Sequence, residues 1–380
     1  NIAALSTVEV GATADQTKAD LNAIGVSGGR KNLIINGGMQ VAQRGTSTTG
    51  NSNAVGFYAC DRVKLFNINA GPTYTVTQDT SAPAGFVNSF KVQCTTADTS
   101  LPADHYTILR TGLIECSDMV QAQFGASSAK SLTYSFWVKS NKTGNQLVMF
   151  VDHKNQKEIG QVFNIAVADT WEKKVITVIG NTGSSFDNSS SSGLTVDFYL
   201  AVGTNRSGGS TPTAWGNRVT INAGATNLSI ADSTANYFQI TGVQLELGSV
   251  ATDFEHATSY GETLALCQRY YQRFTAGGTG TGAMLAVGAS QSPTGSWFFS
   301  PVLSSMRGTP TISFSSLIVS DSANYDLAVT AVVVSGGTAS TDSSKLYLQT
   351  THAGSATQYR AANLRAVSNT AGYLAFDSEL

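Results

Sequence analysis

Residues 131–139 read Ser-Leu-Thr-Tyr-Ser-Phe-Trp-Val-Lys, and this stretch decides the fold class. Every second side chain from Leu132 to Val138 is large and apolar, and polar residues and one tryptophan occupy the positions between them. Such alternation is typical of a strand with one face on a hydrophobic core and the other face toward solvent. The stretch therefore predicts a sheet that packs on a second layer.

Residues 237–246 (Tyr-Phe-Gln-Ile-Thr-Gly-Val-Gln-Leu-Glu) alternate in the same way, but the apolar set changes phase between Ile240 and Val243. A β-bulge at Gly242 explains the change, because one extra residue returns the following side chains to the core face. Further candidate strands lie between turn-rich segments, at residues 32–36, 57–66, 73–78, 90–95, 106–114, 146–151, 171–179 and 194–202. These strands are enough for two sheets, so the sequence predicts a β-sandwich over residues 31–258.

The composition of the 380-residue chain agrees with an all-β protein. Charged residues make up only 13% and glycine occurs 37 times, and the abundant Ser, Thr and Val suit strands and turns rather than long helices. A net charge of −2 gives no basic surface for duplex nucleic acid, so we expect no nucleic-acid partner. The apolar runs at 146–151 and 328–334 are far shorter than the roughly 18 residues of a membrane span, so we expect no membrane insertion.

Two further segments are predicted, one before the sandwich in sequence and one after the connecting segment that follows it. Residues 1–30 are predicted to be an N-terminal stem or linker with a short helix, because Thr13 and Gln16 form a capping box. A smaller C-terminal β-domain is predicted over residues 276–380, after a glycine-rich hinge at 277–282. Its candidate strands lie at residues 284–287, 297–299, 311–314, 327–334, 346–348 and 361–367.

Residues 259–275 are predicted to form a helix that connects the two β-domains. Ser259 and Glu262 form a capping box at its start. An apolar stripe follows at alternating spacings of four and three residues, and it consists of Tyr260, Leu264, Cys267, Tyr271 and Phe274. The stripe suits either packing on the adjacent β-domains or an oligomer interface around a symmetry axis, and the sequence leaves both interpretations open.

Residues that carry catalytic or metal chemistry are scattered along the chain. The cysteines occur singly, without the spacing of a zinc site, and we expect buried free thiols at Cys60, Cys94, Cys116 and Cys267. Three of the four histidines follow an acidic residue, but neighbours on a strand point to opposite faces. The sequence therefore predicts no catalytic residue, no metal and no cofactor, although carboxylates that the fold brings together would still allow sugar cleavage.

Aromatic residues near polar loops are the candidate ligand-binding residues, because an apolar sugar face stacks on an aromatic ring while nearby hydroxyls and amides bind the sugar hydroxyls. The candidates for glycan contact are Trp137, Trp215, Trp297 and Tyr325. Trp137 lies on the polar face of its strand, Trp215 lies in a Gly/Ser/Thr loop, and Trp297 begins a strand in the C-terminal domain. Packing under a loop or at a subunit contact is the alternative interpretation for each tryptophan.

Several short motifs in order along the chain resemble bacteriophage tail fibre proteins. They are Asn32–Gln40 (NLIINGGMQ), Gln43–Ser47 (QRGTS), Ala59–Val63 (ACDRV), Tyr134–Lys139, Gly242–Gly248 (GVQLELG), Ala251–Glu255 (ATDFE), Cys267–Tyr271 (CQRYY), Met306–Thr311 (MRGTPT) and Asp377–Leu380 (DSEL). The resemblance is to fibres that carry a carbohydrate-binding-module-like jelly-roll domain and a C-terminal tip domain, and it covers residues from about 31 to the end.

The resemblance implies a homotrimer on the virion tail, joined to other tail proteins through its N-terminal side. Such a fibre is assembled in the host cytoplasm and acts outside the cell, where it adheres to a bacterial surface glycan or an outer-membrane receptor. It implies no enzymatic activity. Related jelly-roll modules often hold a structural calcium ion, but Gln40 and Thr241-Gly242 stand here where carboxylates would be expected, so no metal ligand is carried over.

Two other functions remain open from the sequence. A fibre-borne polysaccharide depolymerase would need two inward-facing carboxylates about 5–10 Å apart in a groove. A purely structural fibre or adaptor segment would lack exposed aromatic side chains in an open concavity.

Overall fold

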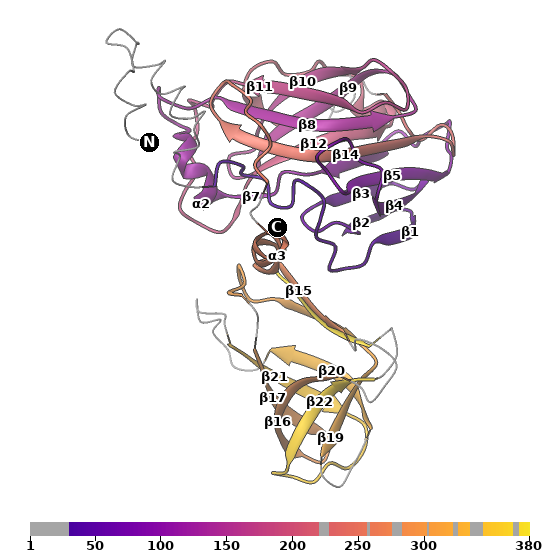
Figure 1. The fold of residues 1–380 in the computed structure, drawn as a ribbon, viewed down its shortest axis with the longest axis vertical. Coiled ribbons are helices and arrows are strands. Elements are labelled where there is room, and N and C mark those ends of the chain that lie inside the picture. Colours follow the sequence, from indigo (N-terminus) through magenta and orange to yellow (C-terminus); the bar gives the residue numbers. More distant parts are fainter. Residues whose placement is uncertain are drawn as a thin grey trace, which may run out of the picture.

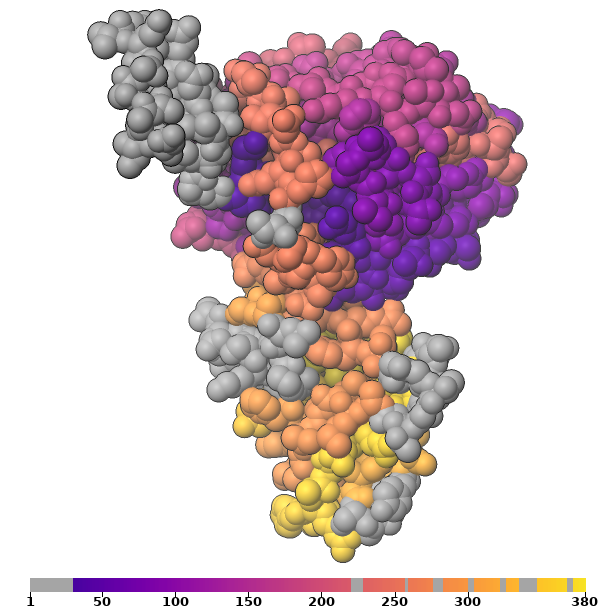
Figure 2. All heavy atoms as spheres, viewed as in Figure 1, coloured from indigo at the N-terminus to yellow at the C-terminus, as the bar shows by residue number. Residues whose placement is uncertain are grey.

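The computed structural model describes residues 30–219, 228–256, 259–275, 283–301, 304–321, 326–334, 345–367 and 372–380. The predicted N-terminal stem up to residue 29, the hinge at 277–282 and Tyr325 lie outside these residues. The described chain forms a large β-sandwich followed by a smaller C-terminal β-domain, with a short helix between them (Figure 1). In Figure 2 the C-terminal domain, in orange and yellow, projects from the wider sandwich.

The sandwich consists of two antiparallel sheets. The first sheet has the order β1-β4-β5-β14-β8-β11, and the second has the order β13-β10-β9-β12-β6-β3-β2, with β7 paired to β12. The strands of the first sheet are β1 (Ser47–Asn51), β4 (Thr73–Asp79), β5 (Ser89–Thr96), β8 (Leu132–Ser140), β11 (Glu172–Val178) and β14 (Tyr237–Leu247). The strands of the second sheet are β2 (Ala54–Phe57), β3 (Lys64–Ile68), β6 (Tyr106–Arg110), β7 (Ile114–Glu115), β9 (Gly144–Asp152), β10 (Lys157–Ile165), β12 (Ser192–Val202) and β13 (Gly216–Asn217). This arrangement confirms the predicted jelly-roll β-sandwich.

Short helical turns lie in the connections of the sandwich. They are α2 (Cys116–Met119), η2 (Val120–Ala122) and η3 (Thr204–Arg206). All four cysteines are free and buried, as predicted, and burial raises the pKa of each thiol.

The core lies between the two sheets and follows the alternation of the sequence. Tyr134 and Phe136 of β8 point inward and are fully buried, and Phe136 packs edge-on against Phe198 of β12 with ring centroids 5.1 Å apart. Burying each such side chain contributes about 1.5–3 kcal/mol to the stability of the fold. The predicted β-bulge is also confirmed, because the pairing of β14 with β8 shifts register between Thr241 and Gln244, and Gly242 has a left-handed φ of 60°.

Three sequence-based expectations about secondary structure are wrong. Residues 57–66 are not one strand, because β2 ends at Phe57, β3 begins at Lys64, and Ala59 and Arg62 between them have left-handed φ angles of 51° and 66°. Residues 32–36 form a turn and not a strand, because Asn36 adopts a left-handed φ of 61° that a strand cannot accommodate. The helix α3 (Tyr260–Gln268) begins at the predicted cap, where the Ser259 hydroxyl accepts a hydrogen bond from the Glu262 backbone N–H, but it ends at Gln268 instead of residue 275. The aromatic residues that follow belong to strand β15 (Tyr271–Thr275) and pair with the last strand of the chain.

The C-terminal domain contains a closed barrel and a three-stranded sheet. The barrel has the order β16-β17-β21-β20-β19-β22, and the sheet has the order β15-β23-β18. The remaining strands are β16 (Met284–Ser292), β17 (Gly295–Pro301), β18 (Thr311–Ser315), β19 (Leu317–Asp321), β20 (Leu327–Val334), β21 (Lys345–His352), β22 (Ala361–Ala366) and β23 (Tyr373–Asp377). The predicted smaller β-domain is therefore present, and it is a barrel.

The C-terminal residues return to the sandwich, next to α3 (Figure 1). Glu379 forms an ion pair with Arg62 of the sandwich, and both side chains are almost completely buried. The Arg62 guanidinium also lies 3.5 Å from the centre of the Tyr270 ring and donates a 2.6 Å hydrogen bond to the Leu113 carbonyl oxygen. Arg44 pairs with Asp377 at 3.0 Å. These contacts join the C-terminal domain to the sandwich.

Candidate ligand-binding pocket

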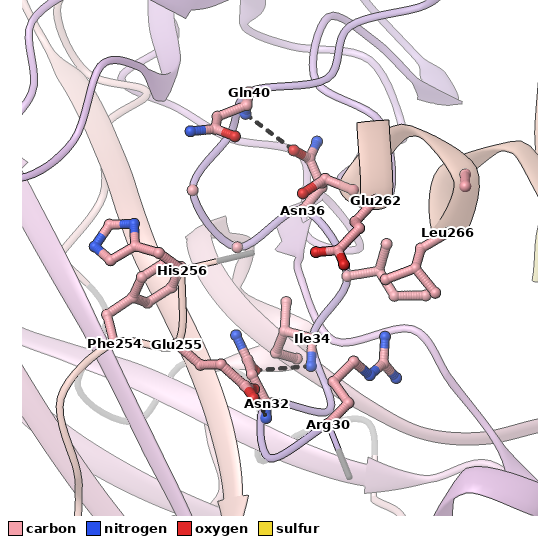
Figure 3. Close-up of a pocket in the computed structure, with 15 residues that line it drawn as sticks. Arg30, Asn32, Ile34, Asn36, Gln40, Phe254, Glu255, His256, Glu262 and Leu266 are labelled. Carbon is pink, nitrogen blue, oxygen red and sulfur yellow. Dashed lines mark hydrogen bonds between the residues drawn. The ribbon is translucent and has the colours of Figure 1, made fainter. Parts of the chain in front are cut away.

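A pocket of about 660 Å³ opens where the sandwich meets α3. Its walls come from residues 30–40, residues 254–256 and the helix α3. Figure 3 shows Phe254 and His256 on one side, Glu262 and Leu266 on the opposite side, and Asn36 and Gln40 along the rim between them. A volume of this size suits one or a few sugar rings or another small polar ligand.

The Asn36 side chain fixes the turn that forms one edge of the pocket. Its amide nitrogen donates to the carbonyl oxygens of Val41 and Asp61, both at 2.9 Å. Its amide oxygen accepts from the backbone N–H groups of Gln40 and Val41 at 2.9 and 3.0 Å. Because all these bonds are internal, Asn36 holds the shape of the pocket edge, and its left-handed backbone starts the turn.

Gly37 follows Asn36 because no side chain fits at this position. A Cβ atom on Gly37 would lie 2.0 Å from the Val243 carbonyl oxygen and 3.3 Å from a ring carbon of Phe254. The close approach allows the Val243 N–H to donate to the Gly37 carbonyl oxygen at 2.9 Å. The Asn-Gly pair thereby connects the turn to β14 and to the aromatic wall of the pocket.

The wall that carries Phe254 and His256 is tied to the sandwich by Glu255. Its carboxylate accepts hydrogen bonds from the backbone N–H groups of Lys31 and Asn32, at 3.2 and 2.5 Å. The backbone N–H of Glu255 in turn donates to the Gln244 side chain of β14 at 2.7 Å. Glu255 therefore acts as a structural clamp between two distant segments of the chain.

An aromatic cluster continues from the pocket along the outer face of the first sheet. Phe254 packs edge-on against Phe86 and His256, with centroid distances of 4.9 and 4.7 Å. Phe86 and Trp137 both lie against Gly242, where a Cβ atom would come within 2.6 and 2.9 Å of their rings. The bulge at Gly242 thus makes room for two aromatic rings. It also places Trp137, one of the candidate glycan-binding residues, beside the cluster that lines the pocket.

Hydrogen-bonding side chains face the aromatic wall. The exposed Gln40 amide and the Glu262 carboxylate, in the first turn of α3, line the pocket, and Arg30 lies at its lower edge in Figure 3. An amide, a carboxylate and a guanidinium provide both donors and acceptors for hydroxyl groups. The arrangement combines rings that can stack on an apolar face with polar groups that can orient a polyol.

Phe254, His256 and Gln40 were not predicted from the sequence as pocket residues, nor was Phe86 as their aromatic neighbour. Phe254 and His256 flank Glu255 just before the helix cap, and this Phe-Glu-His run was the available signal. Gln40 reaches the pocket only because residues 30–40 lie against residues 254–256, which are far away in sequence, and no local pattern reveals that contact.

The other candidate glycan residues lie elsewhere. Trp215 is half-buried, packs edge-on against Phe124 at 5.5 Å, and donates its indole N–H to the Ile179 carbonyl oxygen at 2.6 Å. These contacts anchor its loop to the sandwich. Trp297 is exposed on the outside of the barrel, far from the pocket in the fold, and Tyr325 lies outside the described residues. The structure therefore brings only Trp137 close to the pocket.

The predicted oligomer stripe is not one continuous surface. Cys267 and Tyr271 are buried within the chain, and Tyr271 stacks on Arg44 at 3.5 Å. Phe274 packs on the core of the C-terminal domain. Of the five, Tyr260 is exposed and Leu264 and Phe274 are half-buried, because the helical spacing stops at Gln268 and the later residues follow a strand. The five side chains therefore do not share one helical face. The contacts of Cys267, Tyr271 and Phe274 fit packing on the β-domains, and an oligomer contact by Tyr260 or Leu264 stays a prediction.

The outer face of the second sheet is covered by the chain itself. Met149 and Tyr199 on this face are buried, and Ile108, Leu147 and Val151 complete a small second core. The loop after η3 crosses it, and the Pro212 carbonyl oxygen accepts a 2.8 Å hydrogen bond from the Gly160 N–H of β10. Over these residues the face is therefore covered, and the pocket beside α3 is an open candidate site in the part of the chain that the structure describes.

Within the described residues no group of three or more His, Cys, Asp or Glu side chains is arranged to hold a metal ion. No helix in the described parts of the chain is long and apolar enough to cross a membrane.

Comparison with known proteins gives matches at the level of structure. No protein-family model and no curated protein matches the chain. Among solved structures, the enzymatically active domain of tailspike protein 4 from bacteriophage CBA120 is 13% identical with a TM-score of 0.30; the match covers 57% of this chain and 21% of that one. A putative sugar binding protein from Bacteroides thetaiotaomicron is 13% identical with a TM-score of 0.31, covering 57% of this chain and all of that one. A carbohydrate-binding module solved with β-1,4-galactotriose, TmCBM61, is 12% identical with a TM-score of 0.26, covering 57% and 99% of the two chains.

Proposed function

We propose that the chain is a non-enzymatic adhesion protein, the receptor-binding part of a bacteriophage tail fibre, and that it binds a bacterial surface glycan in the pocket beside α3. The observation that carries this proposal is that aromatic rings and polar side chains line the same pocket: Phe254 and His256 lie on one side, and Gln40 and Glu262 lie across from them. A sugar ring offers an apolar face to aromatic side chains and hydroxyl groups to amides and carboxylates. The pocket supplies both kinds of contact.

The proposal includes assembly into a homotrimer, with the N-terminal side bound to other tail proteins and the whole fibre part of the virion. A half-open pocket with a few polar contacts binds a monosaccharide weakly. Several copies on one particle raise the effective concentration, so an avidity of about 100-fold or more replaces a deep site. Weak individual pockets are therefore compatible with firm adhesion.

A glycan array with the full chain tests the proposal, followed by calorimetry with the best ligand. Gln40→Ala removes one hydrogen-bonding side chain and is expected to weaken binding about 3–10-fold. His256→Ala removes an exposed ring and is expected to weaken it about 10-fold. Gln291→Ala, which changes an exposed glutamine on the barrel, is the matched control and should bind like wild type. Equal binding by all three variants would refute the pocket as the glycan site.

A polysaccharide depolymerase is the second candidate, because two carboxylates, Glu255 and Glu262, line the pocket. Glu255 is held by two backbone N–H groups, which favours its role as a clamp over a role as a catalytic acid. The purified chain should therefore release no reducing ends from host polysaccharide. Turnover that Glu262→Gln abolishes would replace adhesion by cleavage as the function. A chain that binds no glycan and cleaves none would leave a purely structural fibre segment.

A further inference from the structure

The outer surface of the barrel carries an exposed apolar face across four neighbouring strands. It consists of Val287 of β16, Trp297 and Phe299 of β17, Tyr347 of β21 and Val333 of β20, which we call the barrel face. Between 38% and 55% of each of these residues is exposed. Soluble proteins seldom expose several large apolar side chains side by side, so a contiguous set of this kind marks an interaction surface.

The strand register makes the barrel face continuous. Phe299 pairs with Val287 on one side and with Tyr347 on the other, and the rings of Phe299 and Tyr347 meet edge-on at 5.7 Å. Trp297, two residues earlier on β17, reaches Val333 through Gln349 in the next row. The five side chains therefore form two adjacent rows on one side of the sheet.

The inside of the same strands is already filled, with Phe298 and Leu348 in the apolar core of the domain and a polar cluster beside them. Ser290, Ser296 and His352 are buried inside the barrel, with Ser296 Oγ 3.2 Å from Ser290 Oγ and 3.0 Å from His352 Nε2. Trp297, the next residue after Ser296, points outward. Because this interior is full, the outward rings cannot be buried within the barrel, and only another surface can remove them from water. The distribution suits a face that is covered by another protein surface.

The shape and the uncharged side chains of the barrel face limit the kind of partner that can bind it. The barrel is closed by pairing of all six strands, so a partner cannot add a strand at an edge and must present a face of its own. The face is convex and so cannot enclose a small molecule, and its side chains are uncharged and give a charged partner nothing to pair with. Its five side chains expose on the order of 450 Å², more than half of the roughly 800 Å² that each partner of a stable complex buries.

We infer that the barrel face is an interface between copies of this chain, in which the barrel faces of three copies surround a common threefold axis and Trp297 and Phe299 of each copy pack against its two neighbours. Because every copy presents the same apolar, uncharged side chains to this axis, the contact buries no unpaired charge. The inference rests on the homotrimer proposed above and gives that assembly a location. It assigns to a subunit contact the tryptophan that the sequence also offered as a glycan-binding residue.

Light scattering on the full chain at micromolar concentration tests this interface. Wild type is expected to be oligomeric, and Val333→Lys and Phe299→Lys should each raise the dissociation constant at least 10-fold and shift the mass toward the monomer. Val175→Lys is the matched control, because Val175 is a strand valine of the first sandwich sheet with an exposure of 51% against 52% for Val333. Unchanged far-ultraviolet circular dichroism establishes that each variant is folded.

The outcomes separate the interface from the proposed function. A wild-type monomer would overturn both the interface and the proposed trimer, while glycan binding in the pocket is read independently on the array. An oligomer that both lysine variants leave intact would overturn the interface alone. Loss of glycan binding in Phe299→Lys with unchanged mass would also overturn it, because the barrel face would then contact sugar instead of a second copy.

Discussion

The buried ion pair between Arg62 and Glu379 is predicted to hold the barrel against the sandwich. Both side chains are at most 4% exposed, so removal of one partner leaves a charge that water cannot solvate. Glu379→Gln keeps the shape of the side chain and removes only its charge. We expect a loss of about 3–5 kcal/mol of unfolding free energy, the usual cost of breaking a buried pair, and a fall in Tm on the order of 10 °C.

A double-mutant cycle measured by thermal unfolding distinguishes this charge effect from a loss of packing. Arg62→Met removes the cation but leaves an apolar chain beside Tyr270, so the double variant Arg62→Met/Glu379→Gln should be at least about 1 kcal/mol more stable than the sum of the single changes predicts. Lys154→Gln, which breaks an exposed pair with Asp187, is the control and should leave Tm unchanged. Additive effects, or a Tm change for Glu379→Gln no larger than that of the control, would refute the reasoning.

Three smaller predictions test the pocket edge at Gly37, the buried carboxyl group of Asp61 and the hydrogen bond that anchors Trp215. Gly37→Ala should lower Tm and weaken glycan binding together, because a Cβ would strike the Val243 carbonyl oxygen; a variant as stable as wild type would contradict the close approach. Burial raises the pKa of Asp61 to about 6, so protonation of this carboxyl group favours the folded state. The unfolding free energy of wild type relative to Asp61→Asn should therefore rise by up to about 3 kcal/mol as the pH falls from about 6 to 4. If denaturant melts show the same difference between the two proteins at both pH values, the prediction is wrong. Trp215→Phe removes the hydrogen bond to Ile179 and should cost about 1 kcal/mol in the same melts without changing glycan affinity.

Local pattern was enough to predict most of the sandwich from the sequence. The alternation in residues 131–139 identified the inward face of β8, and the change of phase at Gly242 identified the bulge, because both depend on a two-residue repeat that core burial imposes. The strand β10 was not predicted, since Gly160 interrupts its alternation and the charged residues Lys157 and Glu158 begin it. Closure of the C-terminal strands into a barrel is a long-range property and left no local signal.

The end of the connecting helix could not be read from residue spacing. Tyr271 and Phe274 continue the four-and-three repeat of α3, but they pair in β15 with β23, which lies about a hundred residues later. Contacts over such a distance override a helical repeat of only four turns, and they also bury Tyr271 against Arg44. The pocket was hidden for the same reason, because its two walls come from opposite ends of the sandwich sequence.

The pocket and the barrel face both carry aromatic rings, but they differ in the polar groups around those rings. This difference is why we propose glycan binding for the pocket and a subunit contact for the barrel face. At the pocket, Gln40 and Glu262 can replace the water that a bound sugar gives up, so its hydroxyls stay hydrogen-bonded. On the barrel face, a sugar would cover Phe299 and Tyr347 but find few partners for its hydroxyls, and each unsatisfied group costs about 1–3 kcal/mol. The barrel face of a second copy carries few hydrogen-bonding groups, so few of them are left without a partner when the two faces meet. Variants of the pocket should therefore change glycan affinity without changing mass, and variants of the barrel face should change mass without changing the affinity of a single pocket.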